Sequence, residues 1–441
     1  MYALGHELAQ TPSHKFDLAH MRVLLTALGH PENRFPTVLV AGTNGKGSTA
    51  ATLASILQAS GLKTGLYTSP HLVRINERVR LNGEPIGDDD FALLHDVVDR
   101  TAERLVEEGD LPWHPSFFEM LTAMAFEYFA RSRPDMVVLE VGMGGRLDAT
   151  NVVEPRLSII TDIALDHQKY LGETVGEIAR EKAGIIRRGG VVVTLPQLPE
   201  ANDVIGNAIL DAGARAVNAV PYVPPVSPGS ATCFSGGRSR YPLDVMGARI
   251  MVESPLVGRH QLRNLALAIA AAGELHNQGV TRITPEAIAR GIRETHWPGR
   301  FQLLPPAGDN PEYVLDVAHN PAGAWALRST LSSYQERGDA REITLVFGVM
   351  RDKAMQEITE ILFPIAGHVI VTHANNPRSA SPEEIRQAAA RVAARTDIDE
   401  AEDVARALDR ARKAAGRGGL VVVTGSIYIV GEAMRTLGVR I

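Results

Sequence analysis

The segment from residue 37 to residue 60 constrains the fold more than any other part of this chain. It begins with Thr37–Gly42, a short, β-branched and uniformly apolar run, which is typical of a strand buried on both faces. A glycine-rich loop, VAGTNGKGST, covers Val40–Thr49, and the helical pattern Ser48–Ser60 follows it. A buried strand joined by a tight loop to a helix predicts a βα unit of a parallel sheet, with an anion-binding site where the helix begins.

Strands and helices alternate in the rest of the first half, which predicts an α/β fold. A helical pattern covers Ser116–Ala130, and a later one covers Gln261–Ala272. The further strands expected in this half are Lys63–Tyr67, Asp135–Val141, Leu157–Thr161 and Val191–Leu195. Residues 214–254 are rich in Pro, Gly and Ser, with short alternating pieces such as Ala248–Val252, and predict a small antiparallel elaboration.

A second βα series follows the sequence Trp297–Arg300. Its expected strands are Tyr313–Asp316, Ile343–Phe347, His368–Thr372 and Leu420–Thr424, with helices between them. The 441 residues also exceed what one hydrophobic core usually serves. We therefore expect two domains, residues 1–297 and residues 298–441.

Composition excludes several classes of partner. Lys plus Arg is 45 and Asp plus Glu is 51, giving a formal charge of −6, and no basic block stands out, so we expect neither nucleic acid nor a membrane as partner. The N-terminal MYALGHELAQ has no apolar core suited to a signal peptide. The single cysteine, Cys233, cannot form an internal disulfide, which suits a reducing compartment. These features favour a cytoplasmic protein.

The loop departs from the usual phosphate-loop pattern G-x-x-x-x-G-K-[ST], because Gly47 separates Lys46 from Ser48. Its backbone N–H groups and Lys46 still suit the phosphates of a nucleotide, and its glycines are expected to leave room for a polyphosphate. Ser48 or Thr49 can offer a hydroxyl to Mg²⁺. The alternative is a glycine-rich turn with an exposed lysine. The candidate nucleotide-binding residues of the loop are Thr43, Asn44, Gly45, Lys46, Gly47 and Ser48.

The inserted glycine leads to a resemblance that spans most of the chain. GTNGKGST resembles the loop of the folylpolyglutamate and dihydrofolate synthases, whereas the related Mur ligases of cell-wall synthesis have a loop like GTxGKTT. The other motifs similar to those of this family are Tyr67–Leu72, Glu77–Arg80, Leu139–Asn151, Ala164–His167, Arg180–Ile185, Pro298–Gln302 and Leu315–Pro321. The resemblance implies an N-terminal P-loop NTPase-like domain of the Mur-ligase type and a C-terminal Rossmann-like open α/β domain.

The resemblance implies a site for two Mg²⁺ ions beside the loop. Ser69, Glu140 and His167 match metal ligands of the family, and Lys182 matches a lysine whose carbamylation creates an anion for a second ion. Glu140 also ends a buried strand, at the edge where open α/β sheets bind ligands, and a carboxylate suits Mg²⁺. Without the resemblance, His167 reads as an ordinary surface or hydrogen-bonded histidine, and Lys182 as a solvated helix lysine.

The resemblance also implies a substrate pocket. Asp148 matches an aspartate that helps bind the pteridine of the folate precursor. Phe117 and Phe118 stand where aromatic residues of the family line that pocket, although an FF pair in a helical stretch equally suits a hydrophobic core.

Residues of the second half complete the implied site. Asn264 matches a residue that contacts adenine, and Arg300 and Asp316 match residues that contact ATP. Arg300 can pair with a phosphate through its planar guanidinium, and Asp316 can accept a hydrogen bond from a ribose hydroxyl. His319 and Ser426 are candidates for the glutamate site. A cleft between two domains would close around the reactants and exclude water.

The implied activity is that of an ATP-dependent acid–amino-acid ligase. The γ-phosphoryl group would pass to the carboxylate of dihydropteroate or to the γ-carboxylate of a reduced folate, and the amine of L-glutamate would attack the acyl phosphate. Lys46, Lys182 and His319 are expected to take part in catalysis. A Mur-type ligase of UDP-linked sugar peptides and a nucleotide-binding ATPase without ligase activity remain alternatives. By the same resemblance we expect a monomer.

Overall fold

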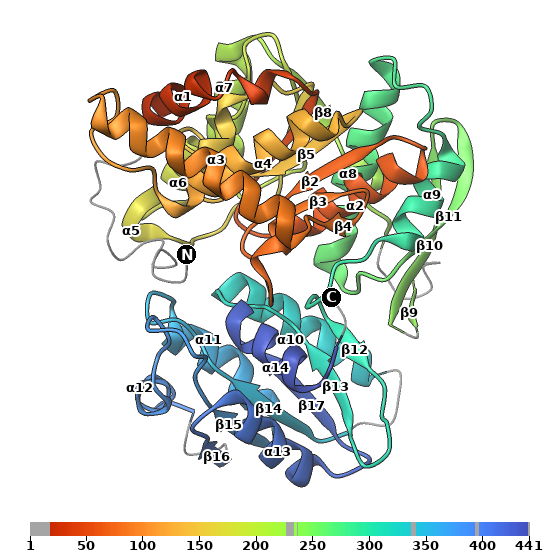
Figure 1. The fold of residues 1–441 in the computed structure, drawn as a ribbon. Helices are drawn as coiled ribbons and strands as arrows, with labels where there is room; N and C mark the ends of the chain where they lie inside the picture. The colour runs from red at the N-terminus through yellow and green to blue at the C-terminus, as the bar shows by residue number, and fades with distance from the viewer. Residues whose placement is uncertain (1–17, 226–232, 236, 337–340, 393–396, 440–441) are drawn as a thin grey trace.

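The computed structural model describes residues 18–225, 233–235, 237–336, 341–392 and 397–439. Two α/β bodies lie one above the other, the upper holding strands β1 to β11 and the lower holding β12 to β17 (Figure 1). Each body has its own sheet and its own hydrophobic clusters. Among the described residues, no helix is long and apolar enough to cross a membrane.

An eight-stranded sheet in the order β4-β3-β2-β5-β1-β6-β7-β8 forms the centre of the upper body. Its strands are β1 Thr37–Ala41, β2 Thr64–Tyr67, β3 Val79–Leu81, β4 Glu84–Pro85, β5 Met136–Glu140, β6 Leu157–Ile160, β7 Val191–Thr194 and β8 Arg215–Asn218. β1 pairs in parallel with both β5 and β6, and all five of its residues are buried. The prediction of a central strand covered on both faces is therefore confirmed.

Helices cover both faces of this sheet, as its uniformly apolar central strands require. One face carries α1 Leu18–Ala27, α3 Asp88–Glu107, α4 Phe117–Ser132, α6 Val175–Ala183 and α7 Pro199–Ala212. The other face carries α2 Lys46–Ala59, α8 Arg259–Asn277 and α9 Pro285–Glu294. The short α5 Gln168–Leu171 follows β6.

The segment 214–254 differs in part from its prediction. β9 Cys233–Ser235, β10 Arg238–Val245 and β11 Ala248–Ser254 form the expected antiparallel elaboration, a three-stranded sheet. β8, however, pairs in parallel with β7 and extends the main sheet, so the prediction is wrong there. Three of the four residues of β8 are exposed, and such an edge strand lacks the apolar run that marks a buried one.

The lower body has a six-stranded sheet in the order β12-β13-β17-β14-β15-β16. Its strands are β12 Gln302–Leu304, β13 Glu312–Leu315, β14 Ile343–Phe347, β15 His368–Val371, β16 Asp397–Glu400 and β17 Leu420–Thr424. Only β12 is antiparallel to its neighbour, so this is an open, mostly parallel sheet. Its helices are α10 Pro321–Gln335, α11 Met355–Leu362, α12 Pro382–Ala388, α13 Val404–Ala415 and α14 Ile427–Thr436.

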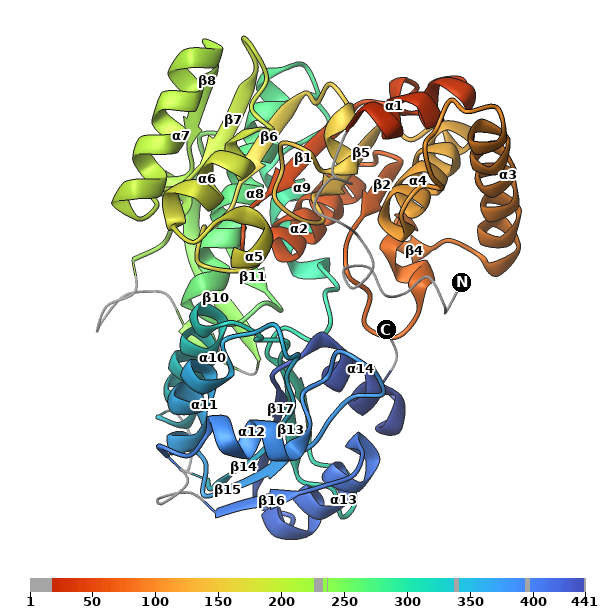
Figure 2. The ribbon, with the colours of Figure 1, turned by 90° about the vertical axis from the view of Figure 1, so that its left-hand side faces the viewer.

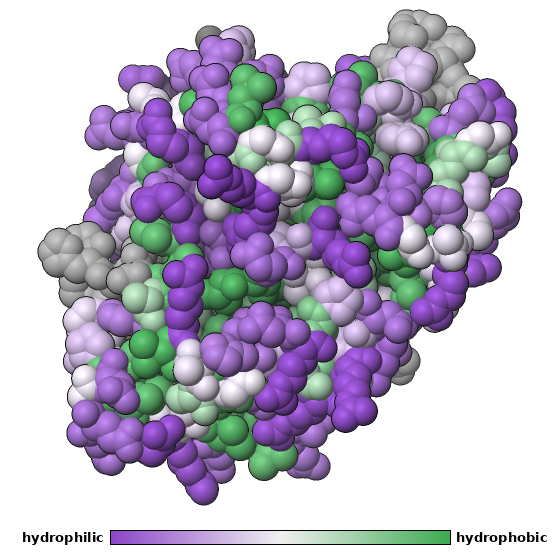
Figure 3. All heavy atoms as spheres, turned by 90° about the horizontal axis from the view of Figure 1, so that it is seen from above, coloured by the Kyte–Doolittle hydropathy of each residue, from purple (hydrophilic) through white to green (hydrophobic). Residues whose placement is uncertain are grey.

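Helices and loops of both bodies meet between the two sheets (Figure 2). Leu72, which follows β2, packs against the hydrophobic cluster that includes α14 of the lower body. The backbone of Leu72 passes so close to Gly431 that a Cβ there would meet its carbonyl oxygen. Seen from above, the upper body presents mainly hydrophilic side chains with smaller hydrophobic groups between them (Figure 3).

Candidate active site

A cavity of about 800 Å³ lies between the two bodies. It is lined by the loops that follow β1, β5 and β6 in the upper body and by the loop between β13 and α10 in the lower body. These loops leave the carboxyl ends of parallel strands, where open α/β sheets bind ligands. The volume suits a nucleotide together with a second small molecule.

The predicted phosphate loop lines this cavity at the start of α2. Gly45 precedes the helix with φ +87°, a conformation that favours glycine, and Lys46 is the first helical residue. The Thr43 and Asn44 N–H groups both donate to the Asp162 carbonyl, at 2.9 and 3.1 Å, which fixes the loop against the strand end of β6. The free N–H groups of the first helical turn then remain for an anion.

Two of the loop glycines also lie close to side chains of the protein. A Cβ at Gly42 would lie 1.8 Å from Thr161 Oγ1, and one at Gly45 would lie 2.1 Å from Asn264 Oδ1. The space beside these residues is thus taken by protein side chains, so close packing requires glycine there. Of the two candidate hydroxyls, that of Thr49 points to the Asn264 carbonyl, 3.4 Å away, whereas Ser48 lines the cavity.

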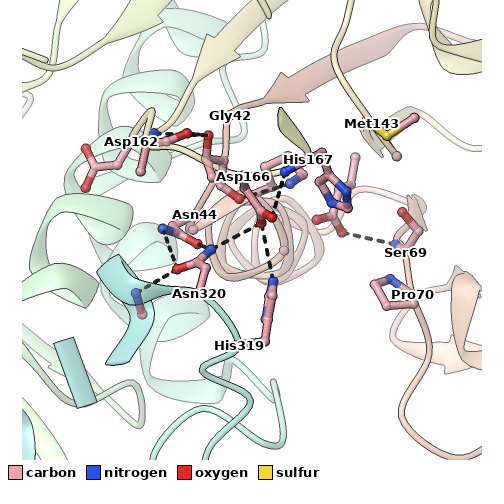
Figure 4. Close-up of a pocket in the computed structure, with 18 of the residues that line it drawn as sticks. Gly42, Asn44, Ser69, Pro70, Met143, Asp162, Asp166, His167, His319 and Asn320 are labelled. Atoms are coloured by element: carbon pink, nitrogen blue, oxygen red, sulfur yellow. Dashed lines mark hydrogen bonds and ion pairs between the residues drawn. The ribbon is translucent and has the colours of Figure 1, made fainter. Parts of the chain in front are cut away.

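All four predicted metal ligands, Ser69, Glu140, His167 and Lys182, line the same cavity as Lys46. Glu140 ends β5 and accepts a hydrogen bond from the Ser69 N–H at 3.2 Å (Figure 4). Burial raises the pKa of Glu140, while the positive charge of Lys46 opposes this effect. Burial also lowers the pKa of His167 to about 4, so its imidazole is neutral near pH 7 and can act as a ligand.

The described residues contain no group of three His, Cys, Asp or Glu side chains placed to hold a metal ion. Glu140, the hydroxyl of Ser69 and the neutral His167 are nevertheless oxygen and nitrogen donors around one cavity. Mg²⁺ commonly takes only one or two protein carboxylates and completes its shell with water and substrate phosphates. The donor set therefore fits Mg²⁺ bound together with a nucleotide.

Lys182 is buried beside the loop, which excludes the solvated helix lysine. Only 3% of the residue is exposed, and its Nζ donates to the Gly42 carbonyl at 2.8 Å. Burial, followed by the charge of Lys46, lowers the pKa of Lys182 to about 7. About half of these side chains are consequently neutral near pH 7, the state in which an amine reacts with CO₂.

The two predicted aromatic residues differ in their environment. Phe118 lines the cavity and lies so close to Gly142 that a Cβ there would meet its ring at 2.5 Å. Phe117 does not line it, and its ring instead lies under the Arg78 guanidinium at 5.4 Å. Asp148 lines the cavity, and its carboxylate accepts hydrogen bonds from the Thr150 hydroxyl at 2.6 Å and from two backbone N–H groups.

The predicted residues of the second half also reach the cavity. Asp316 accepts hydrogen bonds from the backbone N–H groups of Phe301 and Ala318, at 2.8 and 2.9 Å, and burial raises its pKa. Burial lowers the pKa of Arg300, and the negative charges of Asp316 and Glu140 oppose this effect. The lining residues predicted in this half are Asn264, Arg300, Asp316, His319 and Ser426.

A polar network that the sequence did not reveal joins the two bodies across the cavity (Figure 4). Asn320 Nδ2 donates to Asn44 Oδ1 at 3.0 Å and to Asp166 Oδ2 at 3.2 Å. Lys353 Nζ lies 2.6 Å from Asp166 Oδ1, and both side chains are only 9% exposed. Burial opposes the ionisation of Asp166, but His319 and Lys353 outweigh it and hold its pKa below the usual range. Asp166 and Asn320 belong to quoted motifs, whereas Lys353 belongs to none.

Two family models match the chain. Residues 117–272 match the Mur ligase middle domain, and residues 299–427 match the Mur ligase glutamate ligase domain. The phosphate loop at the edge of a parallel sheet and the cavity shared by two bodies agree with these matches. Fold and site thus define an ATP-dependent ligase of the Mur ligase type.

Relatives narrow this class. The dihydrofolate synthase/folylpolyglutamate synthase of Bacillus subtilis (strain 168) is 34% identical over 430 residues, 95% of this chain and 94% of that protein. The folylpolyglutamate synthase of Lacticaseibacillus casei is 34% identical over 432 residues, 98% and 95% of the two chains. Mycobacterium tuberculosis folylpolyglutamate synthase complexed with ADP and AMPPCP has a TM-score of 0.87 at 32% identity, covering 100% of this chain and 98% of that chain. The chain belongs to the dihydrofolate synthase/folylpolyglutamate synthase family.

The resemblance, the fold class and the assignment as an ATP-dependent ligase are therefore confirmed. A ligase of UDP-linked sugar peptides and a plain nucleotide-binding ATPase lose their support, because the three named relatives carry synthase names of the folate family. The two matched segments lie on either side of the domain boundary expected between residues 297 and 298. That boundary itself stays a prediction.

Proposed function

We propose that this enzyme joins L-glutamate to dihydropteroate and to the γ-carboxylate of reduced folates, as a bifunctional dihydrofolate and folylpolyglutamate synthase. The observation that carries this proposal is one cavity bordered by the phosphate loop, by Phe118 with Asp148, and by the second body. The bifunctional name of the Bacillus subtilis relative supports it. So does the structure of Escherichia coli FolC in complex with DHPP and ADP, with a TM-score of 0.81 at 29% identity.

The nucleotide is assigned to the loop and to the hinge between the bodies. The N–H groups at the start of α2 and the charge of Lys46 hold the phosphates. Asn264, which lies against Gly45, is assigned to the adenine. Arg300 is assigned to a phosphate, and Asp316 is assigned to a ribose hydroxyl, from which it would accept a hydrogen bond.

Two Mg²⁺ ions are assigned to the donors beside the loop. Ser69, Glu140 and His167 would hold one, and carbamylated Lys182 would supply an anionic ligand for the other. When bound, they supply positive charge for the phosphate oxygens. Two observations support this role for Lys182: its Nζ lies 2.8 Å from the Gly42 carbonyl oxygen, and its pKa of about 7 leaves about half of these side chains neutral near pH 7.

Catalysis in this proposal rests on positioning and charge. A substrate carboxylate oxygen attacks the γ-phosphorus and ADP leaves; the glutamate amine then attacks the acyl carbon, phosphate leaves, and the amine nitrogen loses a proton. Lys46 and Arg300 stabilise the charge that spreads over the phosphoryl oxygens. Asp148 and Phe118 line the pterin side, and His319 and Ser426 orient the incoming glutamate. Phe117 is retained only as support for Arg78, whose guanidinium it contacts.

A substrate comparison tests the proposal. The enzyme is incubated with ATP, Mg²⁺ and L-glutamate, together with dihydropteroate, a reduced folate or a UDP-linked sugar peptide, and ADP release and glutamate incorporation are measured. We expect both products in equal amounts with the first two acceptors and none with the third. Turnover with reduced folates alone would limit the function to polyglutamylation and remove the dihydropteroate role of Asp148. Turnover with the sugar peptide alone would refute the folate assignment.

We further propose a cytoplasmic monomer that binds neither nucleic acid nor membrane, from the resemblance and the net charge of −6. Light scattering on the protein as it elutes from a size-exclusion column measures its mass, for which we expect 47.6 kDa. A mass of twice that value would refute the monomer.

A further inference from the structure

The inserted glycine of the phosphate loop has a neighbour from the other end of the domain. A Cβ at Gly47 would lie 2.7 Å from Cζ2 and 3.2 Å from Cε2 of Trp297. It would also lie 3.3 Å from Glu140 Oε2. Gly47 is already inside α2 and does not have a positive φ, unlike Gly42 and Gly45. Glycine is therefore required at this position by the approach of the indole ring, and not by backbone conformation.

Trp297 lies where the chain crosses from the upper body to the lower body. Its side chain packs against the hydrophobic cluster of the upper body that includes β1 and α2. Its backbone leads directly into the lower body, where the Gly299 carbonyl accepts a hydrogen bond from the Val317 N–H at 3.0 Å. Three residues after Trp297, Arg300 lines the main cavity. Trp297 thus contacts the phosphate loop and also begins the hinge, the segment Trp297–Arg300 that joins the two bodies.

The contacts of the indole ring with the described residues are packing contacts. Its N–H is buried and has no hydrogen-bond partner among the described residues. The ring borders a second cavity of about 20 Å³, which Glu140, Ser69 and Arg300 also line. The ring therefore lies between the phosphate loop at Gly47 and the residues that lead into the lower body.

We propose that Trp297 is a positioning residue that couples closure of the two bodies to the phosphate loop. Rotation about the hinge moves the ring against Gly47, and this contact sets the distance between Lys46 and Glu140. Gly47 is the other partner in this contact, because any side chain there would displace the indole ring. The inference rests on the proposed binding of ATP phosphates by this loop.

A double-mutant cycle tests the contact. Gly47→Ala should raise the KM for ATP at least tenfold, because the new methyl group overlaps the indole. Trp297→Phe removes the overlapping edge of the ring, so Gly47→Ala combined with Trp297→Phe should recover most of that loss. Trp325→Phe is the matched control, since Trp325 is 55% exposed, and should match the wild type. Losses that simply multiply in the double variant would overturn the inference.

A fluorescence titration tests the coupling. The chain has three tryptophans, so Trp113→Phe with Trp325→Phe leaves Trp297 as the only one. Addition of MgATP should shift its emission, and Gly47→Ala should reduce that shift. Calorimetry on the same protein measures ATP binding independently. Binding without any change in Trp297 emission would overturn this inference alone, whereas absence of binding to the wild type would overturn the proposed function with it.

Discussion

Replacement of Lys182 by methionine should make the protein more stable and inactive. In the structure this lysine is buried, and its pKa falls from 10.5 to about 7. A lysine whose pKa is lower in the folded state destabilises that state. The destabilisation is complete below about pH 7, decreases as pH rises, and vanishes above about pH 10.5. Lys182→Met removes the ionisable group and hence this pH dependence.

The magnitude follows from the two pKa values. At pH 7 the buried lysine costs the folded state roughly 4 kcal/mol, from about 1.4 kcal/mol for each pKa unit. Methionine loses the hydrogen bond to the Gly42 carbonyl, about 1 kcal/mol. We therefore expect Lys182→Met to raise the free energy of unfolding by roughly 3 kcal/mol at pH 7. At pH 9 the increase should be smaller by roughly 2 kcal/mol.

Urea unfolding of both proteins in CO₂-free buffer at pH 7 and pH 9 measures this difference. The variant should unfold at higher urea at pH 7, and the gap should narrow at pH 9. A gap that is the same at both pH values would refute the reasoning, because it would mean that the side chain keeps an ordinary pKa. In buffer with ¹³C-bicarbonate, the wild type should show a carbamate signal by NMR that both Lys182→Met and Lys182→Arg lack. Full activity of Lys182→Arg would show that a cation suffices there.

Three further predictions concern the cavity. Lys46→Ala should abolish most ATP turnover with an unchanged unfolding midpoint, and wild-type turnover would contradict the phosphate role. Glu140→Ala and His167→Ala should each raise the Mg²⁺ concentration needed for half-maximal activity and be non-additive in the double variant; additive effects would mean separate sites. Asp166→Asn should lower the free energy of unfolding by about 3–5 kcal/mol, measured by urea unfolding, because it breaks one side of a buried ion pair. In a Lys353→Met background, Asp166→Asn should lower the free energy of unfolding far less. Equal losses in the two backgrounds would mean that the two side chains are not coupled.

Much of the fold could be predicted because the signals are local. Apolar runs such as Thr37–Gly42 mark strands that are buried on both faces, and these form β1 and its parallel neighbours. β8 and β16 escaped prediction because they are edge strands, mostly exposed, whose sequences RAVN and DIDE have no apolar run. Pairing with the neighbouring strand, and not the character of their own side chains, makes them part of the sheets.

The sequence by itself determined the phosphate loop, because a strand, a glycine-rich turn and a helix follow one another within about two dozen residues. The tertiary structure alone decided which neighbours each side chain of the site has. Gly47 meets Trp297 from 250 positions away, Asp166 meets Lys353 from 187 positions away, and Phe117 turns from the cavity that Phe118 lines. Periodicity and spacing describe only what one segment can do. These contacts arise when two separately folded sheets bring their loops together, so no local pattern encodes them.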